Sequence, residues 1–303
     1  MVICINIMER TKSSYIYAGL AILFWSTVPT AFKISLGELD ILPMLTIASI
    51  TSTIVLFIVV AAGKKIDLIR ITTRKELLQS AILGFINPFL YYLILLKAYQ
   101  LLPAQVAQPL NMVWPIILVF LSVPILKQKI QRKSFIALFI SFIGVYIISS
   151  QGRPFKPGHS DLTGVLLATG SSVFWAFYFI LNVKDKRDEG VKLLLNFVFG
   201  STYLIGTMII LGRWHFETGF RGLAASIYVG IFEMGITFFF WLKALQMSST
   251  TAIVSNMVYL APFFSLFFIH FFLHESVYYT TPLGLVLIIS GILFQNRRSK
   301  IMV

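Results

Sequence analysis

Glu233 is the residue of this 303-residue chain whose type and position most clearly suggest a chemical role. It lies in the middle of a long apolar segment, ten residues before Lys243. At about 1.5 Å per helical residue, its carboxylate is too far from that end to reach water along its own helix. An ionised carboxylate at the centre of a bilayer costs about 2.5–3.5 kcal/mol. We therefore expect Glu233 to face a cavity, where it binds a substrate ammonium or carries a proton; a protonated or hydrogen-bonded packing residue is the alternative.

Three asparagines within apolar segments are further candidates for the wall of a binding cavity. One holds the place of Glu233 in a repeated phrase, and the other two begin the phrases "NMVWP" and "NMVYLAP". Proline removes a helical donor and frees carbonyl groups, so a kink lined by amides is expected there. Packing between helices is the alternative, because asparagine also joins helices in membranes. The three are Asn87, Asn111 and Asn256.

Aromatic residues well inside the apolar segments point to the kind of ligand such a cavity would take. Trp25, Trp114 and Trp175 lie there, and Tyr259 follows Asn256 by one turn. Aromatic rings bury apolar groups and attract cations to their faces. They also form belts at the two membrane surfaces, which is the competing explanation for some of them.

Other polar residues carry less chemical information. Lys97 and Lys243 lie near the ends of their segments, where lysine extends its ammonium to water. His270 precedes His274-Glu275 by one turn, but two histidines without a third ligand do not predict a metal site. The single cysteine, Cys4, cannot form a disulfide within the chain. We expect no metal and no cofactor.

The elements that position these residues are membrane-spanning helices. Hydrophobic residues make up 57% of the chain and charged residues 12%, which is too apolar for one soluble core. Segments of about 20 apolar residues cross the hydrocarbon core as helices, and the long runs lack the alternation of barrel strands. The predicted spans are residues 15–35, 41–62, 76–98, 103–126, 133–150, 161–183, 191–212, 221–243, 250–273 and 278–296.

The basic residues orient these ten spans. The net charge is +13, and lysine and arginine collect on the cytoplasmic side of membrane proteins. With the N-terminus inside, 19 of the 25 basic residues fall on that side. Both termini are therefore predicted to be cytoplasmic. The charge needs no nucleic acid to explain it, since anionic lipid headgroups attract such loops.

The chain also repeats itself. "GFINPFLYYLILLKAYQ" begins at Gly84 and "GIFEMGITFFFWLKALQ" begins at Gly230, which pairs Asn87 with Glu233. The phrase "QGRPFKPGHSD" joins the two halves, residues 14–150 and 161–297. Five spans per half is an odd number, so the second half enters the membrane from the opposite side. Inverted repeats around one midplane site are typical of alternating-access transporters.

The phrases "LKAYQLLPAQVAQPLNMVWPIILVFLS" and "LKALQMSSTTAIVSNMVYLAPFFSLFFIHFFLHE" resemble the EamA repeat of the drug/metabolite transporter superfamily. The resemblance covers nearly the whole chain. "NMVWP" is most similar to the YddG-type branch of aromatic amino acid exporters. The family often has a Gly-Glu turn after the fourth span of each repeat. Only His274-Glu275 approximates it here, and Lys127-Gln128 replaces it in the first half.

Together these features predict an all-α integral membrane protein with ten transmembrane helices in two inverted five-helix repeats. The resemblance implies a secondary transporter of a small metabolite, with amino acids as one candidate class, exporting it across the cytoplasmic membrane. Import and multidrug efflux are alternatives, and an integral membrane enzyme acting on lipid is the rival from another class. No P-loop, dinucleotide motif or hydrolytic triad stands out. The expected partners are the small-molecule substrate, the lipid bilayer and a coupled proton.

Overall fold

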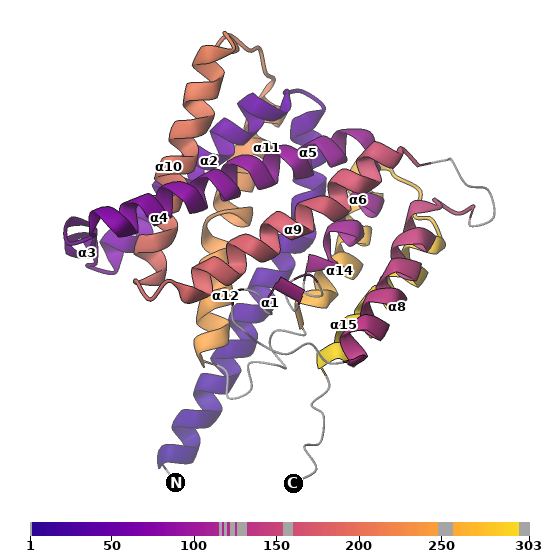
Figure 1. Ribbon diagram of the computed structural model, residues 1–303, viewed down its shortest axis with the longest axis horizontal. Coiled ribbons are helices and arrows are strands. Elements are labelled where there is room, and N and C mark those ends of the chain that lie inside the picture. Colours follow the sequence, from indigo (N-terminus) through magenta and orange to yellow (C-terminus); the bar gives the residue numbers. More distant parts are fainter. Residues whose placement is uncertain are drawn as a thin grey trace.

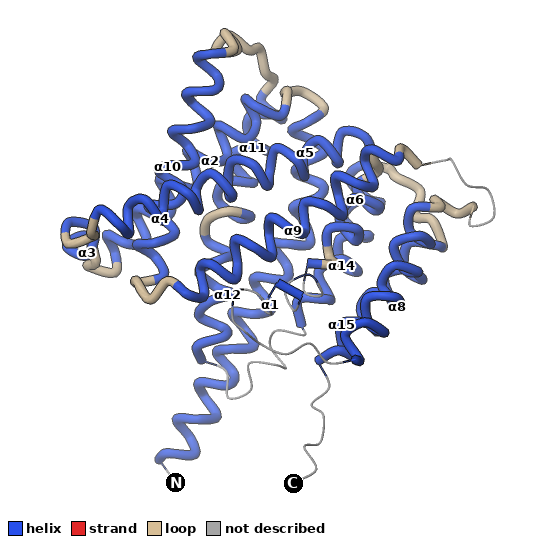
Figure 2. The backbone as a smooth tube through the Cα atoms, viewed as in Figure 1, coloured by secondary structure: helices blue, strands red, loops and turns tan. Residues whose placement is uncertain are grey.

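The computed structural model of the chain describes residues 2–114, 117, 120–121, 125, 132–153, 160–247 and 257–296. These residues form helices joined by turns, with no strand among them, as Figure 1 and Figure 2 show. The elements are α1 (Val2–Leu36), α2 (Ile41–Ala62), α3 (Ile66–Arg70), α4 (Arg74–Gly84), η1 (Phe85–Leu90), α5 (Tyr91–Leu101), α6 (Ala104–Asn111), α8 (Arg132–Ser149), α9 (Leu162–Lys184), α10 (Glu189–Ile210), α11 (Phe220–Tyr228), η2 (Val229–Glu233), α12 (Ile236–Met247), η3 (Val258–Leu260), α14 (Ala261–Leu273) and α15 (Thr280–Asn296).

Six helical stretches among the described residues are long and apolar enough to cross a membrane. They are Ser13–Leu36, Ile41–Ala62, Arg74–Leu101, Leu162–Asn182, Glu189–Ile210 and Phe220–Trp241. Three shorter apolar helices are Phe139–Ser149, Ala261–Leu273 and Thr280–Phe294. The described chain is all-helical, as predicted. Parts of the predicted spans 103–126 and 250–273 lie outside the described residues, and the count of ten inverted spans stays a prediction.

The distribution of side chains is that of a protein in lipid. Large apolar residues such as Phe57, Phe139 and Phe267 are exposed on the outside of the bundle. Small polar residues such as Ser26 and Ser49 are fully buried between helices. Lipid tails accept the exposed phenylalanines, whereas small residues let helix backbones approach closely.

Two long helices are interrupted where they cross a neighbour. The stretch α4–α5 is kinked at η1, where Asn87 has a non-helical backbone (φ −149°, ψ 121°), and the stretch α11–α12 contains the π-helical segment η2. A glycine makes each crossing possible. A Cβ atom at Gly84 would clash with the backbone of Asn196 and Gly200 on α10, and one at Gly230 would clash with the Ala48 carbonyl on α2. Each interruption therefore lies beside a close crossing, and η1 also contains Pro88, which cannot donate to the helical hydrogen-bond ladder.

The helices α8 and α15, far apart in sequence, lie side by side (Figure 1). Their backbones touch at one pair of glycines. A Cβ atom at Gly144 would lie 2.6 Å from the Gly284 carbonyl oxygen, and one at Gly284 would lie 2.6 Å from that of Gly144. Only glycine at both positions permits this approach.

The turn between α9 and α10 is held by a buried ion pair. Arg187 Nη2 lies 2.5 Å from Asp185 Oδ2 and also donates to Ser80 Oγ on α4 at 2.9 Å. Burial favours the neutral acid, but the hydrogen bonds and charge of Arg187 outweigh it and lower the pKa of Asp185. Lys192 adds hydrogen bonds to the carbonyls of Asn182 and Asp185. These contacts hold the start of α10 against α4 and the end of α9.

Candidate functional site

A small cavity of about 90 Å³ lies at the centre of the bundle. Side chains from α1, α5, α6, α9, η2 and η3 line it. Five of the eight residues predicted from the sequence come together there. They are Trp25, Asn111, Trp114, Trp175 and Glu233.

Glu233 is the only charged residue among the described ones that line this cavity. Its side chain is buried, with 9% of the residue exposed, and Tyr92 Oη donates to Glu233 Oε1 at 3.0 Å. A buried carboxylate with one hydrogen-bond donor retains acceptor sites for a proton or a ligand cation.

Asn111 connects three helices around the cavity. Tyr91 Oη on α5 donates to Asn111 Oδ1 at 3.2 Å, and Asn111 Nδ2 donates to Ser171 Oγ on α9 at 2.8 Å. Ser172 Oγ donates to the Asn111 carbonyl oxygen at 2.7 Å. Because its amide oxygen and nitrogen already have protein partners, Asn111 shapes the wall more than it offers free hydrogen bonds.

Aromatic rings form much of the wall. The ring centroid of Trp25 lies 5.3 Å from that of Trp241, and Trp175 lies 5.1 Å from Tyr91. Phe238 and Trp241 are not among the lining residues, but Phe238 contacts two that are, with centroid distances of 6.2 Å to Trp25 and 5.5 Å to Trp175. Such a wall attracts apolar groups and the faces of its rings attract cations.

The other three predicted site residues have different outcomes. Asn87 is 1% exposed, it is not among the residues that line the cavity, and Asn87 Oδ1 has no hydrogen-bond partner in the described structure. Its neighbour Pro88 packs on Gly200 of α10. Asn256 lies outside the described residues, and for Tyr259 the structure describes only the backbone, within η3. Their roles stay predictions.

The cavity also includes residues that sequence reasoning missed. Phe32, Tyr99 and Gln108 line it, and Ser265 Oγ donates to Gln108 Oε1 from α14. Gln108 precedes Asn111 by three residues, so helical spacing places the two on one face and was the available signal. Phe32 and Tyr99 are aromatic residues among many, with no distinguishing pattern.

Other predictions concerned residues away from the cavity. His270 Nδ1 lies 3.0 Å from the backbone oxygen of Glu275. Across the described part of the chain, no three His, Cys, Asp or Glu residues form a group that could hold a metal ion. The Lys243 ammonium lies 5.7 Å from the centroid of the Phe239 ring, near the end of α12.

Comparison with known proteins supports a transporter. The chain is 24% identical over 297 residues to an uncharacterized transporter of Clostridium kluyveri, covering 95% of this chain and 94% of that protein. It is 27% identical over 304 residues to the uncharacterized transporter YvbV of Bacillus subtilis, covering 97% and 94%. Protein PecM of Dickeya dadantii is 26% identical over 232 residues, which cover 73% of this chain and 76% of that protein.

A crystal structure of a protein 17% identical to this chain has the same fold, with a TM-score of 0.66 over 94% of this chain and 96% of that one. The profile of the EamA-like transporter family matches residues 12–150 and again residues 162–297. Two matches to the same family explain the repeated phrases of the sequence. The prediction of a transporter, rather than an enzyme, is confirmed by these relatives. The chain belongs to the EamA-like transporter family, within the drug/metabolite transporter superfamily.

Proposed function

We propose that this membrane transporter exports a small metabolite that carries an amino group, such as an amino acid, across the cytoplasmic membrane by alternating access. One observation carries the proposal: the buried carboxylate of Glu233 faces a central cavity with aromatic walls. A carboxylate at that depth binds an ammonium group, and the tryptophans receive the apolar remainder of the molecule.

The proposal includes ten spans in two inverted repeats, residues 14–150 and 161–297, with both termini cytoplasmic. The two family matches and the odd number of predicted spans per half support the inversion. The start of α1 and the end of α15 lie toward the same side of the molecule in Figure 1, which also supports it. Inverted halves can exchange conformations, and the cavity then opens to one side at a time.

A proton is the proposed coupling ion. The energy for transport comes from an ion gradient or from the substrate's own gradient, because the sequence has no nucleotide-binding motif. Glu233 can carry a proton across when no substrate ammonium is bound. Proton and substrate then compete for one carboxylate, which links their movements.

Transport by proteoliposomes tests this proposal. Glu233→Gln keeps the shape and hydrogen bonding of the side chain but loses the charge. We expect it to fold normally and to transport labelled amino acids at least about tenfold more slowly, the equivalent of about 1.4 kcal/mol. The rate of the original protein should change between about pH 5 and about pH 8, and that of the variant should not.

Glu217→Gln is the matched control, because Glu217 is an exposed carboxylate in the loop before α11. It should leave the rate and its pH profile unchanged. Near-normal transport and an unchanged pH profile in Glu233→Gln would refute the proposed role of the carboxylate.

Efflux of organic cations is the second candidate function. The same observation favours it, since one carboxylate and several aromatic rings also suit a cation without an anionic group. Tetraphenylphosphonium, tested in the same vesicles, separates the two. Transport of this cation without any transport of amino acids would favour multidrug efflux.

A further inference from the structure

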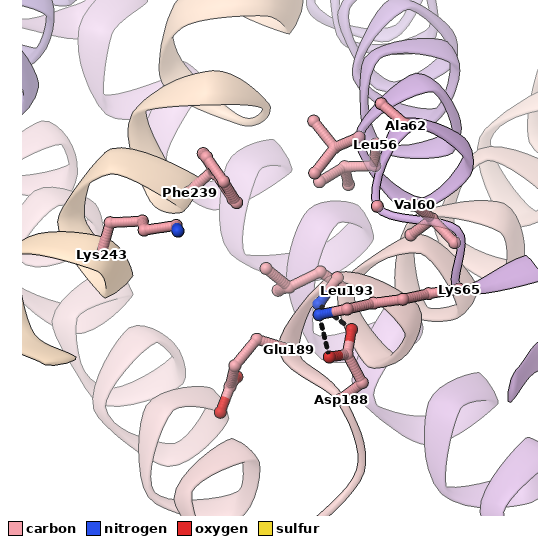
Figure 3. Close-up of a pocket in the computed structure, with 12 residues that line it drawn as sticks. Leu56, Val60, Ala62, Lys65, Asp188, Glu189, Leu193, Phe239 and Lys243 are labelled. Carbon is pink, nitrogen blue, oxygen red and sulfur yellow. Dashed lines mark hydrogen bonds and ion pairs between the residues drawn. The ribbon is translucent and has the colours of Figure 1, made fainter.

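Two pockets of similar size lie at opposite ends of the transporter. We call them the inner pocket and the outer pocket, after the proposed orientation. The inner pocket, of about 500 Å³, lies between the end of α2, the start of α10 and α12 (Figure 3). The outer pocket, of about 520 Å³, lies between the start of α2, the end of α10 and α5. Neither shares a lining residue with the central cavity.

The two pockets are built from equivalent positions of the two halves. Each pair of equivalent lining residues is separated by 146 or 148 positions in the chain, close to the offset of the repeated phrases. The pairs are Lys243 with Lys97, Phe239 with Leu93, Asp188 with Asp40, Lys65 with Arg213, and Val59 with Thr207. The same pocket therefore occurs once at each end.

Each pocket contains an ion pair that joins the two halves. Lys65 Nζ lies 2.6 Å from Asp188 Oδ2 in the inner pocket. Arg213 Nη1 lies 3.4 Å from Asp40 Oδ2 in the outer pocket. These pairs neutralise one basic and one acidic residue in each pocket.

Each pocket also contains a lysine whose charge is not neutralised in this way. In the described part of the chain, neither Lys243 nor Lys97 forms an ion pair with a carboxylate. Figure 3 shows the Lys243 ammonium directed into the pocket, across from Lys65 and Asp188. Glu189, which also lines the pocket, is already paired with Lys192 at 2.7 Å. Lys97 donates to the neutral amide oxygen of Gln100 at 3.2 Å.

The surroundings of these lysines favour an anion with an apolar body. Leu56, Leu193 and Phe239 line the inner pocket, and Leu42 and Leu93 line the outer one. Apolar walls reduce the screening of a charge and strengthen its attraction for an opposite charge. Extension of lysine toward water explains an ammonium near a membrane surface, and the repeat explains why the two pockets are equivalent. The apolar lining around each lysine, which forms no ion pair in the described part of the chain, is what points to an anionic ligand.

We infer that the inner and outer pockets are matched vestibules, in which Lys243 and Lys97 receive the anionic group of the transported metabolite. This inference rests on the proposed function and narrows the substrate to small zwitterions. Glu233 holds the ammonium group at the centre, and a lysine at each end recognises the carboxylate or phosphate on arrival and on departure. An organic cation lacks the group that the vestibules recognise.

The charge preference of each pocket can be measured without transport. Cys4→Ser removes the single native thiol. Val59→Cys then places a thiol in the inner pocket, and Thr207→Cys places one at the equivalent position of the outer pocket. The rates of modification by a sulfonate-bearing and a trimethylammonium-bearing methanethiosulfonate are compared on purified full-length protein in detergent.

We expect Lys243→Gln to lower the ratio of anionic to cationic reaction rates at position 59 by at least about threefold, and to leave position 207 unchanged. Lys97→Gln should lower the ratio at position 207 and leave the ratio at position 59 unchanged. Lys184→Gln, which removes an exposed lysine at the inner end of α9 that lines neither pocket, should change neither ratio. Unchanged ratios in both lysine variants, or thiols that do not react, would overturn the inference.

Anionic lipid headgroups are the other source of a phosphate, and vesicles separate the two sources. If a lipid occupies the pockets, the thiols react in phosphatidylcholine vesicles and are blocked when phosphatidylglycerol is added, which would overturn the inference. Equal reaction in both vesicles supports a soluble metabolite. Because thiol modification needs no transport, loss of this inference leaves the transport proposal standing. Conversely, a protein that does not transport can still show the predicted ratios.

Discussion

The segments η1 and η2 occupy equivalent places in the two halves but use them differently. Each interrupts a long helix directly beside a glycine crossing, with Gly84 against α10 and Gly230 against α2. In η1, Asn87 adopts an extended backbone conformation and its amide oxygen is buried without a partner. In η2, Glu233 lines the central cavity.

The difference indicates a division of labour between the two copies. The first copy supplies structure, because Pro88 packs on Gly200 and the following residues of α5 contribute Tyr91 and Tyr92 to the region of the cavity. The second copy supplies the charge. Tyr92, from the first half, donates its hydrogen bond to Glu233 of the second. A repeat that began as two equal copies thus supports one asymmetric site.

Introducing a charge into the first copy should have the largest effect. Asn87→Asp places a carboxylate where the existing oxygen has no donor, and we expect it to destabilise the folded protein by about 2.5–3.5 kcal/mol. The yield of folded protein and the thermal midpoint in detergent measure this. Glu233→Gln, the corresponding change at the other copy, should retain normal stability. Equal stability of Asn87→Asp and the original protein would contradict the proposal that the first copy has a structural role and only the second copy accommodates a charge.

The glycine crossings should respond alike in the two copies. Gly84→Ala and Gly230→Ala each add a methyl group against a neighbouring backbone that cannot rotate away, at an expected cost of about 1–3 kcal/mol. Gly206→Ala on α10 is the control, because a Cβ atom there meets nothing within 4 Å. The thermal midpoints of the three variants decide the matter. If Gly84→Ala were as stable as Gly206→Ala, the close packing of Gly84 against the backbone of α10 would be contradicted.

The hydrogen bond between the copies should have the smallest effect. Tyr92→Phe removes the donor to Glu233 Oε1, and a hydrogen bond typically contributes about 0.5–1.5 kcal/mol net. We expect slower transport and a displaced pH profile, with the protein still folded. Tyr203→Phe removes a hydroxyl bond to the Ala81 carbonyl, away from the cavity, and should leave the pH profile in place. If Tyr92→Phe and Tyr203→Phe had the same pH profile of transport, Tyr92 would not act on Glu233.

The hydropathy pattern was sufficient to predict an all-helical membrane protein, because long apolar runs require helices in lipid. The position of Glu233 within its run was sufficient to predict that it faces the interior. The extended backbone of Asn87 was predictable, because Pro88 follows it and the proline ring disfavours a helical conformation in the preceding residue. The close packing of Pro88 on Gly200 was not predictable, since the two are distant in the sequence. The hydrogen bonds of Asn111 likewise depend on Ser171, which only the folded arrangement brings near.

The vestibules illustrate the same limit. Lys97 and Lys243 occupy equivalent positions of the two repeated phrases, but in the sequence each is a single lysine near the end of its apolar segment. Their pockets need Asp40 and Arg213, or Lys65 and Asp188, and these residues come from other helices. Sequence periodicity relates residues on one helix, whereas a pocket between helices depends on how they pack.

The contact between Gly144 and Gly284 bears on how the chain is made. The helix α8 is synthesised before α15. Gly284, which packs on Gly144 of α8, follows it by 140 residues and lies on α15. Until α15 enters the membrane, the groove at Gly144 faces lipid or another helix. Biogenesis is therefore complete only when the last helix has inserted, and a chain cut before α15 leaves α8 without its partner.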